Sequence, residues 1–283
     1  MIKKLLFSAD DFGLSVEVNE AIEIAHRQGL LSTANLMIAG DAAEDAIKRA
    51  KRLPNLHVGL HLVTIEGNSV LPHSEIPSLI DQNNLFPSNA LGMGVNYFFN
   101  PKAKEQLRRE IYAQFNAFEK TGLKLDHVDV HKHMHLHPTV GKLLIEVGQS
   151  FNLTHVRLPH EPFAALKATG KAYYQAKATD LILNYWTKIL KWQLNNANIK
   201  YLDWCFGIAW CGHMTFDKIS RLIANLPEGR SEIFFHLAVK NTNKFYALMP
   251  DYEPAEELAA LCNPDLPKLL KEYGITPICW HDA

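Results

Sequence analysis

The stretch KKLLFSADDFG, residues 3–13, has a short apolar centre and ends in two acids, a pattern typical of a buried β-strand followed by a loop. Outward from it, an amphipathic helix is expected at about residues 15–30. The alternation then repeats, with strands at 32–38 and 57–62 separated by a helix at 41–53. Strands that alternate with helices predict a parallel sheet joined by helical crossovers.

The rest of the chain continues this alternation. Residues 64–100 are rich in Gly and Pro and are expected to form a long loop over one end of the fold. About seven strand–helix units predict the α/β class, as a single (β/α) TIM-like barrel of about seven parallel strands, closed or nearly closed, over residues 1–283. The later strands are expected at 125–131, 155–158, 200–209, 232–237 and 275–280, and the later helices at 102–120, 138–147, 164–195, 215–226 and 254–261.

The composition is that of an ordinary globular protein. Of the 283 residues, 47% are hydrophobic and 21% charged, so disorder is not expected. A net charge of −1 gives no electrostatic reason to expect a nucleic-acid partner. No apolar run is long enough for a secretion signal or a bilayer span, so a soluble cytoplasmic protein is expected.

Four cysteines occur, and none belongs to a C-x-x-C pair. The sequence therefore signals neither a structural zinc site nor a redox dithiol. Free thiols in a reducing compartment are expected. We favour the interpretation that the cysteines are buried thiols. The alternative is that Cys205, Cys211 and His213 form a set of soft metal ligands.

Three predicted strands end in residues that can bind a metal ion. The first ends in Asp10 and Asp11, the third in His61, and the 125–131 strand in a cluster of histidines. Taken singly, an acidic pair is more typical of a turn, and a lone strand histidine of the core or the surface. In α/β barrels, however, the carboxyl ends of the strands meet at the active site. Their joint location favours a metal site in which one acid of the pair is a ligand and the other a base.

The sequence LDHVDVHKHMHLHP, residues 125–138, alternates polar with mostly apolar side chains. If it is extended, one face carries almost only imidazole and carboxylate groups. Crowded imidazolium ions repel one another, so metal binding by neutral imidazole is a natural use. Strand residues two apart are about 6–7 Å apart, so only one or two can reach a single ion. The polar positions are His127, Asp129, His131, His133, His135 and His137.

Among these histidines, His131 is the favoured ligand because it lies where the strand is expected to become a loop. His133 and His135 are expected to line the substrate cleft, and His127 and His137 to be structural. The rival geometry pairs His131 with His135 on a helix, as in H-E-x-x-H sites. It is disfavoured because a lysine occupies the Glu position and a proline follows.

Three further polar residues lie near predicted strand ends, namely Arg157, Glu161 and His236. His236 follows an apolar run and is the candidate for a general acid. Glu161 is expected to contact the substrate. For each of the three, a surface ion pair or a buried hydrogen bond is the alternative.

The motifs SADDFGLS, VGLHLVT and DVHKHMHLHP, with their spacing, resemble those of the YdjC-like carbohydrate deacetylases. The resemblance runs from residue 5 to about residue 275 and includes STANLMIAGDAAEDA and EIFFH. HKHMHLHP, FGIAW and AQFNAFEKTGLKLDHV are most similar to the hopanoid-biosynthesis-associated deacetylase branch, and the chitooligosaccharide deacetylases match less well. Val130 stands where the family usually has Ser or Gly, and Leu237 where many members have Pro. Both departures concern loop shape and substrate rather than the reactive groups.

The resemblance implies a distorted (β/α) barrel that removes an N-acetyl group from an amino sugar. It implies one divalent metal ion, zinc or magnesium, and two histidines with one carboxylate favour zinc on grounds of softness. The implied substrate is an N-acetylated sugar or a glycolipid such as a glycosylated hopanoid. By motif, the metal ligands are Asp11, His61 and His131, the base is Asp10, the acid is His236, and Arg157 orients the base.

Residues 181–194 combine aromatic and aliphatic side chains with two lysines. This pattern is typical either of a barrel helix with a wide core face, which we favour on the pattern alone, or of a surface that contacts a membrane peripherally. The resemblance to the hopanoid branch adds weight to the second interpretation. The sequence is also compatible with a homodimer. The apolar residues of the segment are Ile182, Tyr185, Trp186, Ile189, Leu190 and Trp192.

Three functions compete. A metal-dependent amino-sugar N-deacetylase is favoured, and a different metallohydrolase on the same barrel, such as a phosphoesterase, is the first alternative. Release of acetate rather than phosphate separates these two. A non-catalytic metal- or carbohydrate-binding protein is the third, and it gives no reason for the additional acid Asp10.

Overall fold

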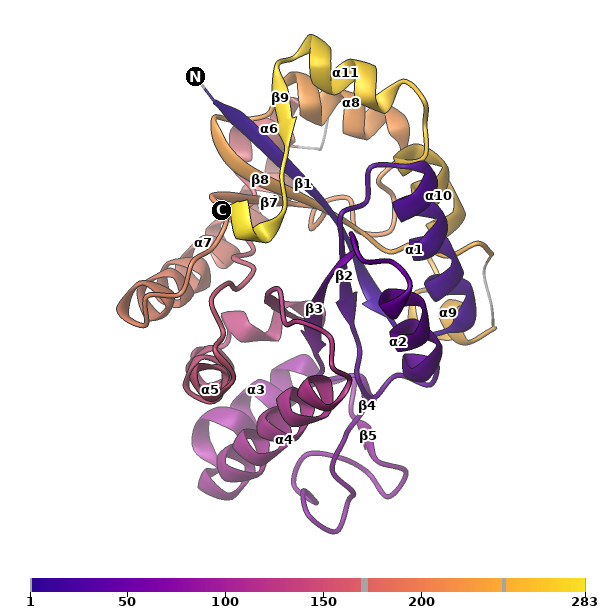
Figure 1. Ribbon diagram of the computed structural model, residues 1–283. Helices are drawn as coiled ribbons and strands as arrows, with labels where there is room; N and C mark the ends of the chain where they lie inside the picture. The colour runs from indigo at the N-terminus through magenta and orange to yellow at the C-terminus, as the bar shows by residue number, and fades with distance from the viewer. Residues whose placement is uncertain (1, 169–172, 241–242, 283) are drawn as a thin grey trace.

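The computed structural model describes residues 2–168, 173–240 and 243–282, and a parallel sheet forms its centre (Figure 1). The order of the strands is β6-β3-β2-β1-β8-β7, and β9 pairs with the first residues of β1. Every ladder in this sheet is parallel, as the alternation of strands and helices predicted. The strands are β1 (Lys3–Phe12), β2 (Thr33–Leu36), β3 (His57–Leu62), β6 (Val128–Val130), β7 (Trp204–Phe206), β8 (Gly229–Phe235) and β9 (Ile275–Pro277).

The sheet is curled into a half-barrel and does not close as a TIM barrel. Between its edge strands β6 and β7 runs the segment near residue 156, which is held by isolated parallel bridges from Val156 to Val128 and from His155 to Lys200. The strand expected at 155–158 is therefore reduced to single pairings. Proline at position 159 has no N–H to donate to a ladder. The prediction of a distorted α/β barrel agrees with this arrangement, and the prediction of closure is wrong.

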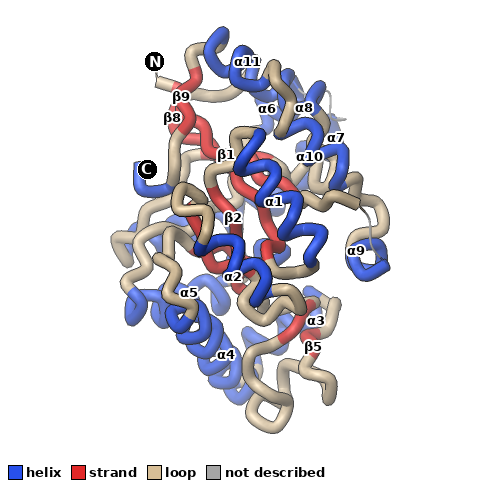
Figure 2. The backbone as a smooth tube through the Cα atoms, turned by 45° about the vertical axis from the view of Figure 1, so that its right-hand side comes forward, coloured by secondary structure: helices blue, strands red, loops and turns tan. Residues whose placement is uncertain are grey.

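Helices surround the sheet, with α1, α2 and α10 along one side and α3, α4 and α5 along another (Figures 1 and 2). Ser15 caps α1, the helix expected at about residues 15–30, because its hydroxyl accepts the N–H of Val18 at 3.3 Å. The helix expected at 164–195 is divided into α6 and α7, and residues 169–172 lie outside the described part. The helices are α1 (Val16–Gln28), α2 (Ala43–Lys51), α4 (Pro101–Lys120), α5 (Pro138–Gly148), α6 (Phe163–Ala168), α7 (Tyr173–Asn196), α8 (Phe216–Ala224), α9 (Asn243–Leu248), α10 (Pro254–Leu261) and α11 (Leu266–Glu272).

The segment 64–100 contains more structure than the expected loop. It forms a small antiparallel pair, β4 (Gly67–Asn68) with β5 (Leu85–Phe86), and a helix, α3 (Ala90–Phe99). The sequence did not predict this helix, because the Gly and Pro residues of the segment are typical of a loop. Buried polar groups anchor the segment: Glu110 of α4 accepts the N–H groups of residues 70 and 71 at 2.8 and 2.9 Å.

The histidine cluster is not an extended strand beyond residue 130. β6 ends at Val130, and His131–Leu136 forms a 3₁₀ turn in which Lys132 and His133 have φ values of 52° and 54°. The expected face of alternating imidazoles is therefore wrong after His131. The position of His131 at the boundary between strand and loop is confirmed.

Two expectations drawn from composition concern the chain as a whole. Within the described residues, no helix combines the length and the apolar character needed to cross a membrane. The four cysteines are free thiols, as predicted.

Candidate active site

β1 delivers two carboxylates to the same region at its carboxyl end. The β1–β2 pairing shifts its register between Ala9 and Phe12, and Asp11 has a left-handed φ of 62°. Successive residues of a regular strand point to opposite faces. This irregularity lets both Asp10 and Asp11 approach His61. Aspartate adopts left-handed backbone conformations more readily than most residues do.

Asp11, His61 and His131 converge on one point. His61 lies near the end of β3, and His131 directly follows β6. His61 Nε2 is 3.2 Å from His131 Nδ1 and 3.3 Å from Asp11 Oδ1, and His131 Nδ1 is 3.4 Å from Asp11 Oδ1. For metal–ligand bonds of about 2.0–2.1 Å, two ligands of a tetrahedral ion lie about 3.3 Å apart. The three atoms therefore have the spacing of three ligands of such an ion.

The Asp11 carboxylate is the clearest indication that a cation belongs at this point. The residue is 1% exposed, and neither carboxylate oxygen has a hydrogen-bond partner. Although burial opposes ionisation, His131 and His61 hold the pKa of Asp11 well below its usual range. A buried carboxylate without hydrogen bonds is energetically costly. The donor set of two imidazoles and one carboxylate fits a catalytic zinc ion, which keeps a further position open for water.

Asp129 orients His61 from behind. The two residues lie opposite each other in the β3–β6 pairing, and both oxygens of Asp129 are 2.8 Å from His61 Nδ1. This contact favours the proton on Nδ1 and leaves Nε2 free to face Asp11 and His131. Histidines that bind metals commonly have such a carboxylate partner.

A single buried arginine holds the acids beside this centre. Arg157 is 0% exposed and donates to both oxygens of Asp10 at 2.7 and 2.8 Å and to Asp129 at 2.6 Å. It also donates to both oxygens of Glu232, at 2.8 and 3.0 Å. The planar guanidinium with five N–H donors matches this set of carboxylates, which a lysine ammonium could not do. The orientation of the Asp10 carboxylate is thereby fixed.

Asp10 is held from a second side by Asn35 of β2, which donates to its Oδ1 at 2.6 Å. Although burial opposes ionisation, the Arg157 guanidinium holds the pKa of Asp10 well below its usual range. Asp10 is therefore ionised at neutral pH, and it lies on the cavity wall. Its low basicity means that it accepts a proton readily only from an acidified donor.

His236 lines the same cavity and directly follows β8. Its backbone N–H donates to Glu257 at 2.6 Å, and its Nδ1 lies 3.7 Å from the thiol of Cys211. Although burial opposes protonation, Cys211 and the acids Asp11 and Asp10 raise the pKa of His236 well above its usual value. This direction favours the protonated imidazole, which is the form that can donate a proton.

The cavity over these residues has a volume of about 890 Å³, within the range of about 300–1,000 Å³ that is usual for small-molecule sites. The segment 64–100 forms part of its wall. The space is large enough for a sugar and is lined by both polar and apolar side chains. The lining includes Asp10, His61, His131, His133 and His236, with Leu14, Met37, Val63, Phe86 and Phe234.

Of the three expected substrate contacts, only His133 lines the cavity. His135 is wholly buried, and its Nε2 lies 2.9 Å from the carbonyl oxygen of Arg157. Glu161 is buried and accepts the backbone N–H groups of residues 207–209 at 2.8 to 3.0 Å. His135 and Glu161 therefore bind backbone groups of the site and are not part of the cavity lining.

The remaining candidate residues are distributed as follows. His127 is wholly buried and stacks on Trp280, which fits the structural role expected for it. Cys205 is buried, and burial raises its thiol pKa well above the usual value. Cys211 contacts His236 and the Tyr252 hydroxyl. Cys205, Cys211 and His213, the alternative soft ligands, do not form a cluster.

Three residues of the site had no predicted role, namely Asn35, Asp129 and Glu232. Asp129 alternates with His131 in the sequence, and the alternation itself was the available signal. Asn35 and Glu232 interrupt or begin apolar strands. Since buried polar groups need partners, an isolated polar residue in a buried strand is a usable signal of a site.

Together these features define a class of protein, in which a curled parallel sheet carries a buried Asp-His-His centre at the carboxyl ends of its strands. The chain belongs to the family of YdjC-like proteins, whose family model matches residues 4–272. This match includes the three motifs that supply the centre.

Two similar proteins are named carbohydrate deacetylases. The chain is 36% identical over 156 residues to that of Brevibacillus brevis, a stretch that covers 55% of this chain and only 59% of that protein. It is 27% identical over 284 residues to that of Geobacillus stearothermophilus, covering 100% of this chain and 98% of that protein. Among solved structures, an Enterococcus faecalis V583 protein described in terms of cellobiose-phosphate cleavage superposes with a TM-score of 0.76. Its sequence identity is 20%, with 100% of this chain and 99% of that one covered, and this likeness shows the fold.

Proposed function

We propose that this chain is a metal-dependent hydrolase that removes the N-acetyl group from an N-acetylated amino sugar. The observation that carries the proposal is the buried Asp11 carboxylate, which has no hydrogen bond and converges with His61 and His131 beside a cavity lined by Asp10 and His236. The relatives named as carbohydrate deacetylases support the same reaction.

Amide hydrolysis needs assistance at the carbonyl group, the water and the leaving amine. A divalent ion held by Asp11, His61 and His131 would polarise the carbonyl and lower the pKa of a water to about 7. Asp10 accepts a proton from the attacking water, and Arg157 with Asn35 keeps its carboxylate in a fixed orientation. His236 donates a proton to the amine as it leaves.

Zinc is the metal that we propose. Imidazole nitrogen is a better ligand for zinc than for magnesium, which prefers oxygen. The ligand separations of 3.2 to 3.4 Å also match a tetrahedral ion.

We further propose a lipid-linked amino sugar, of the glycosylated hopanoid type, as the substrate. On α7, Tyr185, Trp186 and Trp192 are 64%, 37% and 65% exposed, whereas Leu190 faces the core. Exposed Trp and Tyr side chains suit the boundary between lipid and water, so this helix would support peripheral membrane contact. The side chain of Ile182, also expected in this surface, lies outside the described residues.

The zinc-loaded protein should release acetate from N-acetylated amino sugars, and removal of the metal with a chelator should abolish the release reversibly. A diacetylchitobiose-type oligosaccharide and an N-acetylglucosaminyl lipid should be compared at equal concentration. Faster release from the lipid supports the proposed acceptor, and faster release from the oligosaccharide contradicts it. Phosphate release without acetate release would identify a phosphoesterase instead, and absence of any turnover would contradict the hydrolase proposal.

Replacing His236 with Asn should reduce acetate release from an amide by about 10²–10⁴-fold, because the amine then leaves without a proton donor. An aryl acetate should be affected far less, since a phenolate leaves without protonation. The measurement is kcat for both substrates. His213→Asn, the same change at a histidine outside the cavity lining, is the matched control and should change neither rate. Equal losses on both substrates would contradict the role of His236 as an acid.

A further inference from the structure

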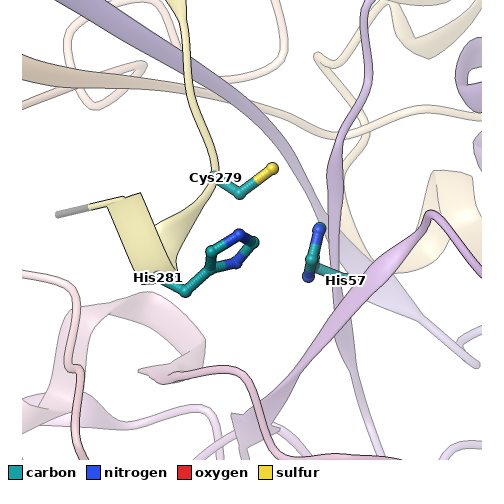
Figure 3. Close-up of side chains that lie close together, drawn as sticks. All are labelled: His57, Cys279 and His281. Atoms are coloured by element: carbon teal, nitrogen blue, oxygen red, sulfur yellow. The ribbon is translucent and has the colours of Figure 1, made fainter.

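A second cluster of ligand-type side chains lies at the opposite end of β3 from the candidate active site. His57 begins β3, and Cys279 and His281 come from the C-terminal segment (Figure 3). One ligand atom from each residue lies within 4.8 Å of the other two. The rings of His57 and His281 are 4.8 Å apart, centroid to centroid. Residues far apart in the sequence thus present two imidazoles and a thiol to one point.

The backbone around Cys279 and His281 is fixed by contacts on either side. β9 pairs with β1, and the next residue, Ile278, donates its N–H to Leu5 at 3.0 Å. Trp280 is 0% exposed and stacks on His127, with ring centroids 4.6 Å apart and planes within 17°. Because Trp280 is buried, its two neighbours are held at the surface facing His57 (Figure 3). The cluster is therefore preorganised.

A carboxylate supports the first imidazole. Asp126 Oδ1 lies 3.5 Å from His57 Nδ1, and its other oxygen lies 3.2 Å from His127 Nδ1. This contact leaves His57 Nε2 available to a cation. Histidines that bind metals typically have a carboxylate partner of this kind. The contact is longer than that of Asp129 with His61, at 3.5 Å against 2.8 Å, but it lies on the same ring nitrogen.

We infer that His57, Cys279 and His281 form a second metal site, which binds a divalent thiophilic cation such as zinc. Two imidazoles and a thiolate are the ligands that zinc prefers, and hard oxygen-seeking cations bind such a set poorly. The side chains of His57 and His281 are 29% and 56% exposed, so a solvent molecule can complete the coordination. A bound metal ion would link the C-terminal segment, through Cys279 and His281, to the start of β3 and would stabilise the folded state.

Cobalt titration of the full chain tests this site separately from the active site. Cobalt bound to a thiolate gives a strong sulfur-to-metal charge-transfer absorption, and Asp11, His61 and His131 supply no sulfur. The wild-type protein should show this absorption. Cys279→Ser and His281→Asn should lose or strongly weaken it and should bind one equivalent of cobalt fewer. Cys262→Ser and Cys211→Ser, whose thiols lie elsewhere, should retain it.

The outcome does not depend on any catalytic activity. No charge-transfer absorption in the wild type, or its persistence in Cys279→Ser, would overturn the inference. Loss of the absorption in Cys211→Ser alone would assign the sulfur ligand to the active-site cavity and would also overturn it. Far-UV circular dichroism checks that the variants fold. As a second readout, zinc should raise the melting temperature of His131→Ala, and should raise it less once Cys279→Ser is added.

Discussion

Substitution of Asp10 by Asn should reduce acetate release by about 10²–10⁴-fold while the metal remains bound. Asn has nearly the same shape as Asp but cannot accept a proton from water. The metal should stay because Asp10 is not among the three atoms that converge on the metal point. Acetate release and the zinc content of the purified variant are the two measurements.

The hydrogen bonds that Arg157 donates to Asp10, Asp129 and Glu232, here called the arginine network, add an expectation about stability to the Asp10→Asn experiment. An Asn amide beside Arg157 loses one charged hydrogen bond, so some loss of stability is expected together with the loss of activity. Asp217→Asn, a surface acid paired with Arg221, controls for the same chemical change away from the site. Should Asp10→Asn keep more than about a tenth of the wild-type rate, its role as general base is wrong.

Replacing Arg157 with Met should lower the free energy of unfolding by about 3–5 kcal/mol or more. The change leaves Asp10, Asp129 and Glu232 buried without their shared cation. Methionine fills similar space but donates no hydrogen bond. Urea unfolding at neutral pH gives the value. The exposed ion pair of Arg221 with Asp217 provides the control. Arg221→Met should lower the free energy of unfolding by less than about 1 kcal/mol.

The stability deficit of Arg157→Met should depend on pH in a defined direction. In the wild type, Arg157 holds the pKa of Asp10 below its unfolded value, so this contribution is present above the unfolded pKa and is lost as the pH falls. Without Arg157, burial alone raises the pKa of the same carboxyl. The variant should therefore lose stability as the pH rises, and its deficit should be smaller at pH 5 than at pH 8. A deficit that grows on acidification would contradict the assignment.

The sequence predicted β1, α1, β3 and the convergence of the acidic pair with His61 and His131, because these depend on local patterns and one general rule of parallel sheets. The choice of Asp11 over Asp10 came from the resemblance to the family. The conformation after Val130 could not be predicted in this way. Lys132 and His133 both have left-handed backbones, which the alternation of side chains does not encode. A pattern of period two is compatible with a strand, and tertiary packing decided against it.

The arginine network and the cluster of His57, Cys279 and His281 could not be predicted from the sequence, for another reason. Arg157 meets Glu232, and His57 meets Cys279, only because distant segments become neighbours in the folded sheet. No spacing motif records either pairing. The absence of a C-x-x-C pair argues against a local zinc motif, but it does not bear on ligands that come from segments far apart in the chain.

The place of β1 in the middle of the sheet has a consequence for biosynthesis. Ser8 of β1 hydrogen-bonds Glu232 of the neighbouring β8, 224 residues later in the chain. At about 5–20 residues per second, the ribosome needs roughly 10–45 s to make the chain between them. For that time the nascent first strand has one edge without its final partner, and such an edge is prone to pairing with other chains. The protein should therefore depend on protection during translation more than a fold with sequentially adjacent strands does.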